Sequence, residues 1–206
     1  MFSLAEMTAA FDVSRVSANA ARFDLKKAEA INSAHLRILA PDDFAQRLEP
    51  YVVAELRGTA PVMSDMLDDA QRPLLVAAAP LVQERSTVLS DAARMLRFLF
   101  VDDAAFTPDD DAAAKNLDAA AVPVLDAALT SLDKPGDWTA AEIEAALKGA
   151  LVDGLGLKPR KAFGPVRVAV TGRTVSPPLY ESMELLGRER SLGRLRAGVE
   201  RAREVG

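Results

Sequence analysis

Arg167 and the short run Ser176-Pro177-Pro178-Leu179 are the side chains of this sequence best suited to binding a planar polar ligand. An arginine guanidinium is a planar fork of N–H donors that matches a pyrimidine carbonyl or a phosphate. Two consecutive prolines fix φ and suit the first turn of a helix, where their missing N–H groups cost nothing. With Leu179 they would form a stiff apolar shelf beside the Ser176 hydroxyl and free backbone N–H groups. This chemistry is recognition by hydrogen bonding and stacking.

The same residues lie in a basic block, residues 158–206. The block holds eleven Lys/Arg and five Asp/Glu, a net charge of +6, whereas residues 1–157 hold fourteen and twenty-five, a net of −11. A basic block on an acidic chain is the electrostatic pattern expected of a site for a phosphate backbone. Single-stranded RNA loops are bound by stacking on splayed bases and by hydrogen bonds to their edges, while Lys and Arg hold the phosphates. Charge alone leaves a solvated helical surface as the alternative.

The composition excludes several kinds of site. The chain has no cysteine and one histidine, so it cannot form a disulfide framework, a zinc-thiolate site or a thiol nucleophile, and most metal and triad schemes are excluded as well. We therefore expect no metal. No apolar run approaches the roughly eighteen residues of a membrane span, and no charged segment precedes a signal-type apolar core. We expect a soluble, cytoplasmic protein that does not contact a membrane.

Half of the residues are hydrophobic, few are aromatic and Ala is abundant, which favours helices over sheets. Asp24 can cap a helix on which Ala28, Ile31, His35 and Leu39 share one face, so His35 is predicted to be structural. A second helix is predicted to end at Gly58. From Leu81 to Leu99, apolar residues at helical spacing predict one continuous helix that carries Arg85 and Arg94.

The second half of the sequence begins after a polar break at residues 102–111, which we take as a domain boundary. Thr139 and Glu142 are spaced as a capping box, with Trp138 placed for a hydrophobic staple. Valines alternate through residues 166–170 as in a strand, which conflicts with the helical expectation. The arginines between residues 188 and 203 surround leucines predicted to be core, and we expect most of these arginines to face solvent.

Four motifs of the basic block follow one another in a fixed order: Pro165-Val-Arg-Val-Ala-Val-Thr-Gly172, Ser176-Pro-Pro-Leu-Tyr-Glu181, Leu185-Leu-Gly-Arg-Glu-Arg190 and Arg194-Leu195. This succession resembles the end of bacterial glutamyl-tRNA synthetases, which has a PLRxALTG segment, a TPGLFE-like turn and an LLGKER…RL helix. The chain has Val166 for the family's Leu and Pro178 for its Gly, which puts in question any contact that needs close backbone approach at Pro178. The family is helical at residues 166–170, and we follow it.

The resemblance implies roles for single residues. In the family, the arginine of PLR and the residues of the turn contact the first two anticodon bases, which here are Arg167, Ser176, Pro177 and Leu179. An arginine of the first anticodon-binding subdomain reads the third base. Residues 82–91 resemble its surroundings and suggest Arg85, with Arg94 nearby and an ordinary surface arginine as the alternative. Further phosphate contacts, which position an RNA without specifying its sequence, are expected from Lys158, Arg160, Lys161 and Arg173.

The N-terminal segment resembles the same family. Residues 11–32 are similar to a VSxxxARFDxKK stretch that touches the inner corner of the tRNA. The apolar pattern of Phe2, Leu4 and Met7 begins abruptly, and we expect the complete protein to begin upstream. The expected architecture is all-α: a helical bundle or cage of two small anticodon-binding subdomains, residues 41–105 and 106–206, preceded by the helical tail of a stem-contact region, residues 1–40.

The sequence contains neither the HIGH-like nor the KMSKS-like signature of a class I synthetase, and no Gly-rich phosphate loop. The resemblance therefore implies the C-terminal part of a glutamate–tRNA ligase, which binds the anticodon loop and inner stem of tRNA(Glu) as a monomer. This part would have no catalytic residue and no cofactor, whereas the parent enzyme would use ATP and Mg.

Two other functions are the alternatives. A free-standing helical adaptor would bind protein partners through apolar faces, but such an adaptor has no need to concentrate basic charge at one end. Salt concentration distinguishes this adaptor from an RNA-binding protein. RNA binding weakens steeply as salt rises, whereas binding through an apolar interface does not. An independent enzyme is excluded by the lack of any acid/base or nucleophile constellation.

Overall fold

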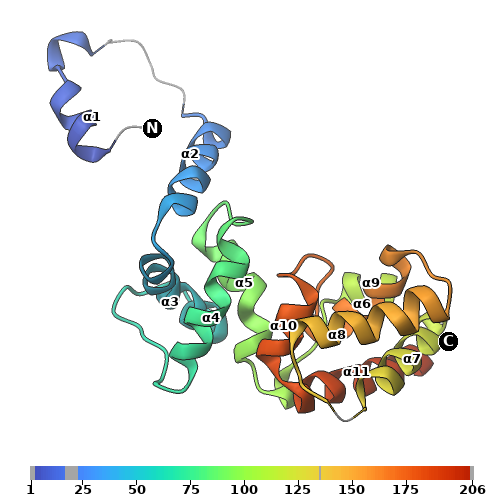
Figure 1. Ribbon diagram of the computed structural model, residues 1–206. Coiled ribbons are helices and arrows are strands. Elements are labelled where there is room, and N and C mark those ends of the chain that lie inside the picture. The colour runs from blue at the N-terminus through green and yellow to red at the C-terminus, as the bar shows by residue number, and fades with distance from the viewer. Residues whose placement is uncertain (1–2, 17–22, 135, 205–206) are drawn as a thin grey trace.

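Short turns and capping residues divide the chain into helices, as the all-α expectation requires (Figure 1). The computed structural model describes residues 3–16, 23–134 and 136–204, and no strand occurs among them. The α-helices are α1 Leu4–Ala10, α2 Leu25–Ile38, α3 Pro41–Arg57, α4 Gln71–Gln83, α5 Leu89–Phe100, α6 Asp110–Asn116, α7 Val122–Leu132, α8 Ala140–Leu147, α9 Pro159–Thr171, α10 Leu179–Leu186 and α11 Arg188–Glu204. Short 3-10 turns (η1 Val13–Arg15, η2 Asp103–Ala105, η3 Ala119–Ala121) and a π-helical turn (η4 Lys148–Gly154) connect some of them.

Helix ends follow the capping rules that the sequence suggested. The Asp24 carboxylate accepts a hydrogen bond from the Lys27 N–H at the start of α2, which confirms the predicted cap. Pro41 occupies the first turn of α3. Gly58 ends α3 with φ 66°, in the left-handed conformation that glycine adopts most readily. At α8, the structure shows the Thr139 half of the predicted capping box, in which the Glu142 N–H donates to the Thr139 hydroxyl.

The helix predicted from Leu81 to Leu99 is wrong as a continuous element. The structure has two helices, α4 and α5, joined by a turn at residues 84–88. The Ser86 hydroxyl donates to the Val82 carbonyl at 2.7 Å, and Val88 is extended with φ −137° and ψ 159°. A serine that satisfies a carbonyl in this way competes with the backbone for the next helical turn. Arg85 therefore lies in the turn, whereas Arg94 lies on α5.

Residues 166–170, whose valines alternate as in a strand, form the middle of α9. Val166, Val168 and Val170 are all fully buried, because α9 packs against α6, α7 and α11 and so has little solvent-facing surface. The alternation thus reflects burial on several sides of a helix, and the helical expectation is confirmed.

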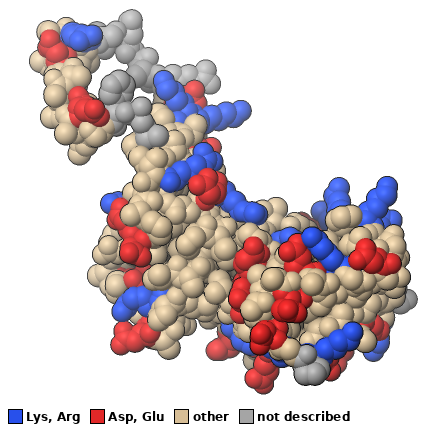
Figure 2. Space-filling view, viewed as in Figure 1, with Lys and Arg blue, Asp and Glu red and all other residues tan. Residues whose placement is uncertain are grey.

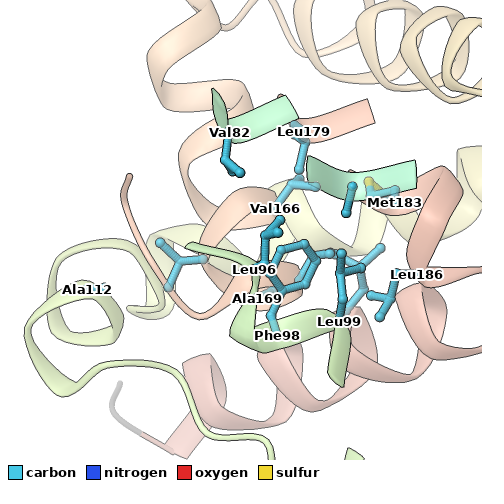
Figure 3. Packing of buried hydrophobic residues seen from close by; sticks show 14 of the residues in the cluster. Val82, Leu96, Phe98, Leu99, Ala112, Val166, Ala169, Leu179, Met183 and Leu186 are labelled. Atoms are coloured by element: carbon cyan, nitrogen blue, oxygen red, sulfur yellow. The ribbon is translucent and has the colours of Figure 1, made fainter. Parts of the chain in front are cut away.

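The core is continuous between the two halves of the chain (Figure 3). Leu96 and Leu99 of α5 pack in one cluster with Ala169 of α9 and with Leu179 and Met183 of α10. Helices α3, α4 and α5 contact one another most, and α6 to α11 form a second group. Division into subdomains at residues 41–105 and 106–206 stays a prediction, since one shared core connects them.

The N-terminal segment contributes little to this core. Helix α1 has no buried residue, and α2 buries only Ser33 and Leu36. The predicted apolar face of α2 is wrong for Ile31, which is 48% exposed, whereas Ala28, His35 and Leu39 are half-buried. Helix α2 is joined to the α4–α5 turn mainly by polar contacts, among them a hydrogen bond from the Asn32 side chain to the Thr87 carbonyl at 2.6 Å. Phe2 lies outside the described residues, and α1 extends away from the helical body (Figure 1).

Three arginines of α11 bind protein groups, so the expectation that most arginines here face solvent is wrong for them. Arg194 is 4% exposed and donates to the carbonyls of Val170 and Phe98 and to the Asp103 carboxylate, each at 2.9 Å. Arg190 donates to Asp103 as well and to the Leu99 and Val101 carbonyls. Arg188 donates to carbonyls at residues 132–136 and lies over the Trp138 ring. The Arg190–Arg194–Asp103 cluster ties α11 to the end of α5.

Every described helix is too short or too polar to cross a lipid bilayer.

Candidate nucleic-acid interface

Arg167 projects from α9 towards the segment that precedes α10. Its Nη1 donates to the Ser176 hydroxyl at 2.5 Å and to the Pro177 carbonyl at 3.0 Å. Among the described residues, Arg167 has no carboxylate partner, and its Nε and Nη2 donate no hydrogen bond. Burial and the nearby charge of Arg85 both lower the pKa of Arg167 below its ordinary value. A half-buried guanidinium with open donors and no counter-ion is suited to bind an anionic or carbonyl-rich ligand.

The structure brings Ser176, Pro177 and Leu179 next to Arg167, but it buries them. Ser176 is 4% exposed and Leu179 is 3% exposed, and Leu179 packs into the core shown in Figure 3. The apolar shelf predicted from the two prolines and Leu179 is therefore largely internal. Pro178 remains half-exposed at the surface. The Leu179 side chain thus holds the turn in place, and Pro178 forms part of the surface beside Arg167.

Arg85 comes close to Arg167 although the two residues belong to different halves of the chain. The turn that carries Arg85 and the segment before α10 project from the same edge of the molecule (Figure 1). Arg85 is exposed, and its charge is close enough to lower the pKa of Arg167. Neither arginine forms an ion pair among the described residues, so their like charges repel one another, and an anionic ligand bound beside both would relieve the repulsion. Arg94 lies apart from this pair, on α5.

A groove of about 1030 Å³ runs beside Arg167 between α6, α7 and α9. Its lining combines basic side chains with one aromatic ring: Lys115, Arg160, Lys161, Arg167 and Phe163. Figure 2 shows Lys and Arg side chains projecting from the edge of the molecule at the α6–α9 end. A basic groove with an aromatic wall is the combination that single-stranded nucleic acids bind, through phosphates and base faces respectively.

The predicted phosphate contacts divide into two groups. Lys158, Arg160 and Lys161 are exposed at the start of α9, with the last two in the groove. Arg173 lies elsewhere: it pairs with Asp109 at 3.0 Å and donates to the Arg94 carbonyl at 3.5 Å. The charge of Arg173 is thus largely neutralised by the protein.

Tyr180 is a component of this region that the sequence reasoning missed. Its ring meets that of Phe163 edge to face, with centroids 5.9 Å apart and planes at 89°. Burial and the Glu144 carboxylate raise the pKa of Tyr180, so its hydroxyl is neutral near pH 7. The position of Tyr180 directly after Leu179 in the motif was the available signal, but only the fold shows that it meets Phe163.

Among the described residues, no group of three or more His, Asp and Glu side chains is placed to hold a metal ion.

Residues 43–199 match the family described as anticodon binding domain. The chain belongs to this family. The resemblance found in the motifs of residues 165–195 is thereby confirmed, and the basic groove lies inside the matched region of the anticodon binding domain.

Curated relatives of this anticodon binding domain are longer proteins. The chain is 61% identical over 197 residues to the glutamate–tRNA ligase of Saccharopolyspora erythraea, and that alignment covers 96% of this chain and 38% of the relative. It is 59% identical to the glutamate–tRNA ligase of Rhodococcus jostii, with the same two coverages. The chain thus spans about two-fifths of the length of the curated relatives that it matches.

Solved structures share the fold. A glutamate tRNA ligase from Elizabethkingia meningosepticum, crystallised with its amino acid, superposes with a TM-score of 0.70 at 21% identity, covering 97% of this chain and 37% of that one. The glutamate-tRNA synthetase of Elizabethkingia anophelis gives a TM-score of 0.68 at 24% identity, with coverages of 97% and 36%. At these identities the likeness establishes the all-α fold.

Proposed function

We propose that this chain is the anticodon-reading part of a glutamate–tRNA ligase and binds the anticodon loop of tRNA(Glu) along the groove beside α9. The observation that carries the proposal is the pair of Arg167 and Arg85, two guanidiniums from separate halves of the chain that influence each other's charge and form no ion pair among the described residues. An anticodon loop presents base carbonyls and phosphates within a few ångströms of one another. Such a ligand satisfies both arginines at once.

Within this proposal, every predicted residue except Arg173, which pairs with Asp109, has a role that its surroundings support. Arg167 donates to a base or phosphate from the open Nε and Nη2 atoms, while Ser176 and Pro177 hold its Nη1. Buried Leu179 fixes the turn that presents them. Arg85 reads the third anticodon base from the α4–α5 turn. Phosphate contacts come from Lys158, Arg160 and Lys161, which line or flank the groove.

The parent enzyme would attach glutamate to its tRNA with ATP and Mg, at residues that this chain does not contain. Residues 1–40 would contact the inner stem of the tRNA. We infer that the parent works in the cytoplasm and as a monomer. The free-standing adaptor remains the second candidate because of one observation: apolar side chains of the N-terminal segment are exposed, Phe11 at 69% and Phe23 at 76%.

The test is binding of this chain to a tRNA(Glu) anticodon stem-loop beside a stem-loop with a scrambled loop. We expect the anticodon loop to bind at least about tenfold more tightly, and Arg167→Ala to remove the roughly 1–3 kcal/mol of a good base contact. Arg196→Ala is the matched control, because it removes the same charge from an exposed position of α11. Equal binding of both RNAs, unchanged by Arg167→Ala, would refute the proposal. Binding that does not respond to salt would favour the adaptor.

A further inference from the structure

The turn between α4 and α5, residues 84–88, is held by side chains of α2. Backbone carbonyls on both sides of Arg85 accept hydrogen bonds from this helix, which lies beside the turn (Figure 1). The three bonds run from Asn32 Nδ2 to the Thr87 carbonyl at 2.6 Å, from the Ser33 hydroxyl to the Ser86 carbonyl at 3.2 Å and from Arg37 Nε to the Glu84 carbonyl at 3.3 Å. Among the described residues, α2 supplies the donors for these carbonyls of the turn.

The end of α2 is held in return by Gln83, the last residue of α4. Gln83 is buried, and its Nε2 donates to the carbonyls of Leu36 at 2.8 Å and Leu39 at 3.0 Å. The last carbonyls of a helix have no partner within the helix, so Gln83 satisfies the end of α2. Each segment thus satisfies polar backbone groups of the other. Because α2 buries only Ser33 and Leu36, these bonds are a large part of its attachment to the helical body.

The Arg85 side chain is placed by the backbone of this turn. Arg85 is exposed and forms no ion pair among the described residues, so no partner of its own fixes the guanidinium. Its backbone N–H donates to the Val82 carbonyl at 3.0 Å. Nevertheless its charge lies close enough to Arg167 to lower the pKa of that residue. The position of Arg85 beside Arg167 therefore follows from where the turn is held.

A turn whose carbonyls are bonded only to water can adopt many backbone conformations, and ordering it costs conformational entropy when a ligand binds. A side chain that contacts a ligand precisely needs its backbone held by neighbouring hydrogen bonds before the ligand arrives. The bonds from α2 provide this, because they fix the carbonyls immediately before and after Arg85.

We propose that Asn32 and Ser33 of α2 are positioning residues for Arg85 and that they set where its guanidinium meets the RNA. The inference rests on the proposed function and extends it to a helix that need not touch the anticodon. Helix α2 belongs to the segment for which we propose contact with the inner stem. One helix would then both lie against the stem and hold the turn that presents Arg85 to the loop.

A double-mutant cycle tests this role with the complete chain and a tRNA(Glu) anticodon stem-loop. Asn32 is uncharged and exposed, so Asn32→Ala changes neither the charge that attracts phosphates nor the core. Asn32→Ala should weaken binding about threefold to tenfold, the effect of one lost hydrogen bond. In an Arg85→Ala background the same substitution should weaken binding less than about twofold, because no guanidinium remains to be positioned. An equal loss in both backgrounds would show a general structural role and overturn the proposal.

Amide hydrogen exchange of the free chain tests the turn without RNA. Asn32→Ala and Ser33→Ala should both speed exchange at residues 84–88 while leaving α9 and α10 unchanged. Ile38→Ala is the matched control, because it shortens an exposed side chain of the same helix that donates no hydrogen bond. Ser33→Thr, which keeps the hydroxyl, should restore slow exchange and RNA affinity. Unchanged exchange in both alanine variants would overturn the proposal.

The outcomes separate this inference from the proposed function. If Arg85→Ala leaves anticodon-loop binding unchanged, the positioning role is overturned, whereas preference of the unmodified chain for the anticodon loop over a scrambled loop would still stand. Failure of the unmodified chain to distinguish the two loops would refute the proposed function itself. The exchange experiment contains no RNA, so its result on the turn does not depend on that failure.

Discussion

Arg194 on α11 is buried and Arg167 on the neighbouring helix α9 is half-buried, and their guanidiniums have opposite surroundings. Arg194 donates to Asp103 and to two backbone carbonyls, and its guanidinium stacks on Phe106 at 3.7 Å. Burial lowers the pKa of Arg194 to about 10, and the hydrogen bond with Asp103 opposes that shift. Arg167 has two protein acceptors on one nitrogen and no carboxylate.

This difference separates an arginine that holds the fold from one that, under the proposed function, a ligand would satisfy. All three nitrogens of Arg194 donate to Asp103 or to carbonyls at the ends of α5 and α9, so it fixes the half of the chain that carries Arg85 against the half that carries Arg167. The donors of Arg167 are only partly used, although burial makes each unused donor costly. A fold retains such a cost where a ligand satisfies it.

The largest expected effect is on stability, at Arg194. Arg194→Ala should lower the free energy of unfolding by about 3 kcal/mol, the lower end of the range for breaking a buried ion pair, because Asp103 is half-exposed and can be rehydrated. Urea titration followed by circular dichroism measures the change. Arg196→Ala, on the exposed side of the same helix, should change it by less than about 0.5 kcal/mol. A small effect of Arg194→Ala would mean that the cluster does not couple the two halves.

Arg167→Ala should show the reverse pattern. Its free energy of unfolding should stay within about 0.5 kcal/mol of the wild-type value, because the substitution removes a desolvated charge that Arg85 repels as well as two hydrogen bonds. Anticodon-loop affinity should nevertheless fall by about 1–3 kcal/mol. The same urea titration and a fluorescence binding assay give both numbers on one protein sample. Loss of stability as large as that of Arg194→Ala would erase the distinction between the two arginines.

The sequence predicts the helices more accurately than the roles of the arginines that they carry. Helices α2, α3 and α9 were predictable because Asp24, Gly58 and the family pattern signal them locally. The break between α4 and α5 was missed because it depends on Ser86 and on the packing of α2 over the turn, which apolar spacing does not encode.

The motifs suggest the residues of the candidate site but not their surroundings. Arg167 and Arg85 lie at one edge of the fold, and their roles stay predictions. The sequence cannot distinguish Arg194 from Arg167, because the partners of Arg194 lie more than twenty residues away along the chain, at Asp103, Phe98 and Val170. The contact of Tyr180 with Phe163 is likewise absent from the local sequence, since the two rings become adjacent only when α9 and α10 pack.

The pH dependence of the free energy of unfolding tests the role of Asp103, the carboxylate that binds Arg194. Burial raises the pKa of Asp103, but hydrogen bonds and charges from Arg190 and Arg194 outweigh it, and the net pKa is below the ordinary 3.8. The carboxylate therefore stabilises the fold above pH 3.8, and this contribution is lost as the pH falls through the lowered value. Asp103→Asn should cost about 1 kcal/mol near neutral pH, discounted because Asp103 is 46% exposed, and nothing well below pH 3.8. A difference that does not shrink in acid would contradict this role.

The smallest effects separate the two groups of predicted phosphate contacts. Lys161 is exposed in the groove and has no ion pair among the described residues, so Lys161→Ala should weaken anticodon and scrambled loops equally and reduce the slope of log K against log salt by about one. Arg173 is already neutralised by Asp109, so Arg173→Ala should leave that slope unchanged and cost at most about 1 kcal/mol of stability, as for other partly exposed ion pairs. Binding isotherms at several salt concentrations distinguish the two variants. Equal slopes would show that a place in the groove does not decide which basic side chains contact phosphates. The difference between paired and unpaired basic residues would then hold for the buried arginines and not for the surface ones.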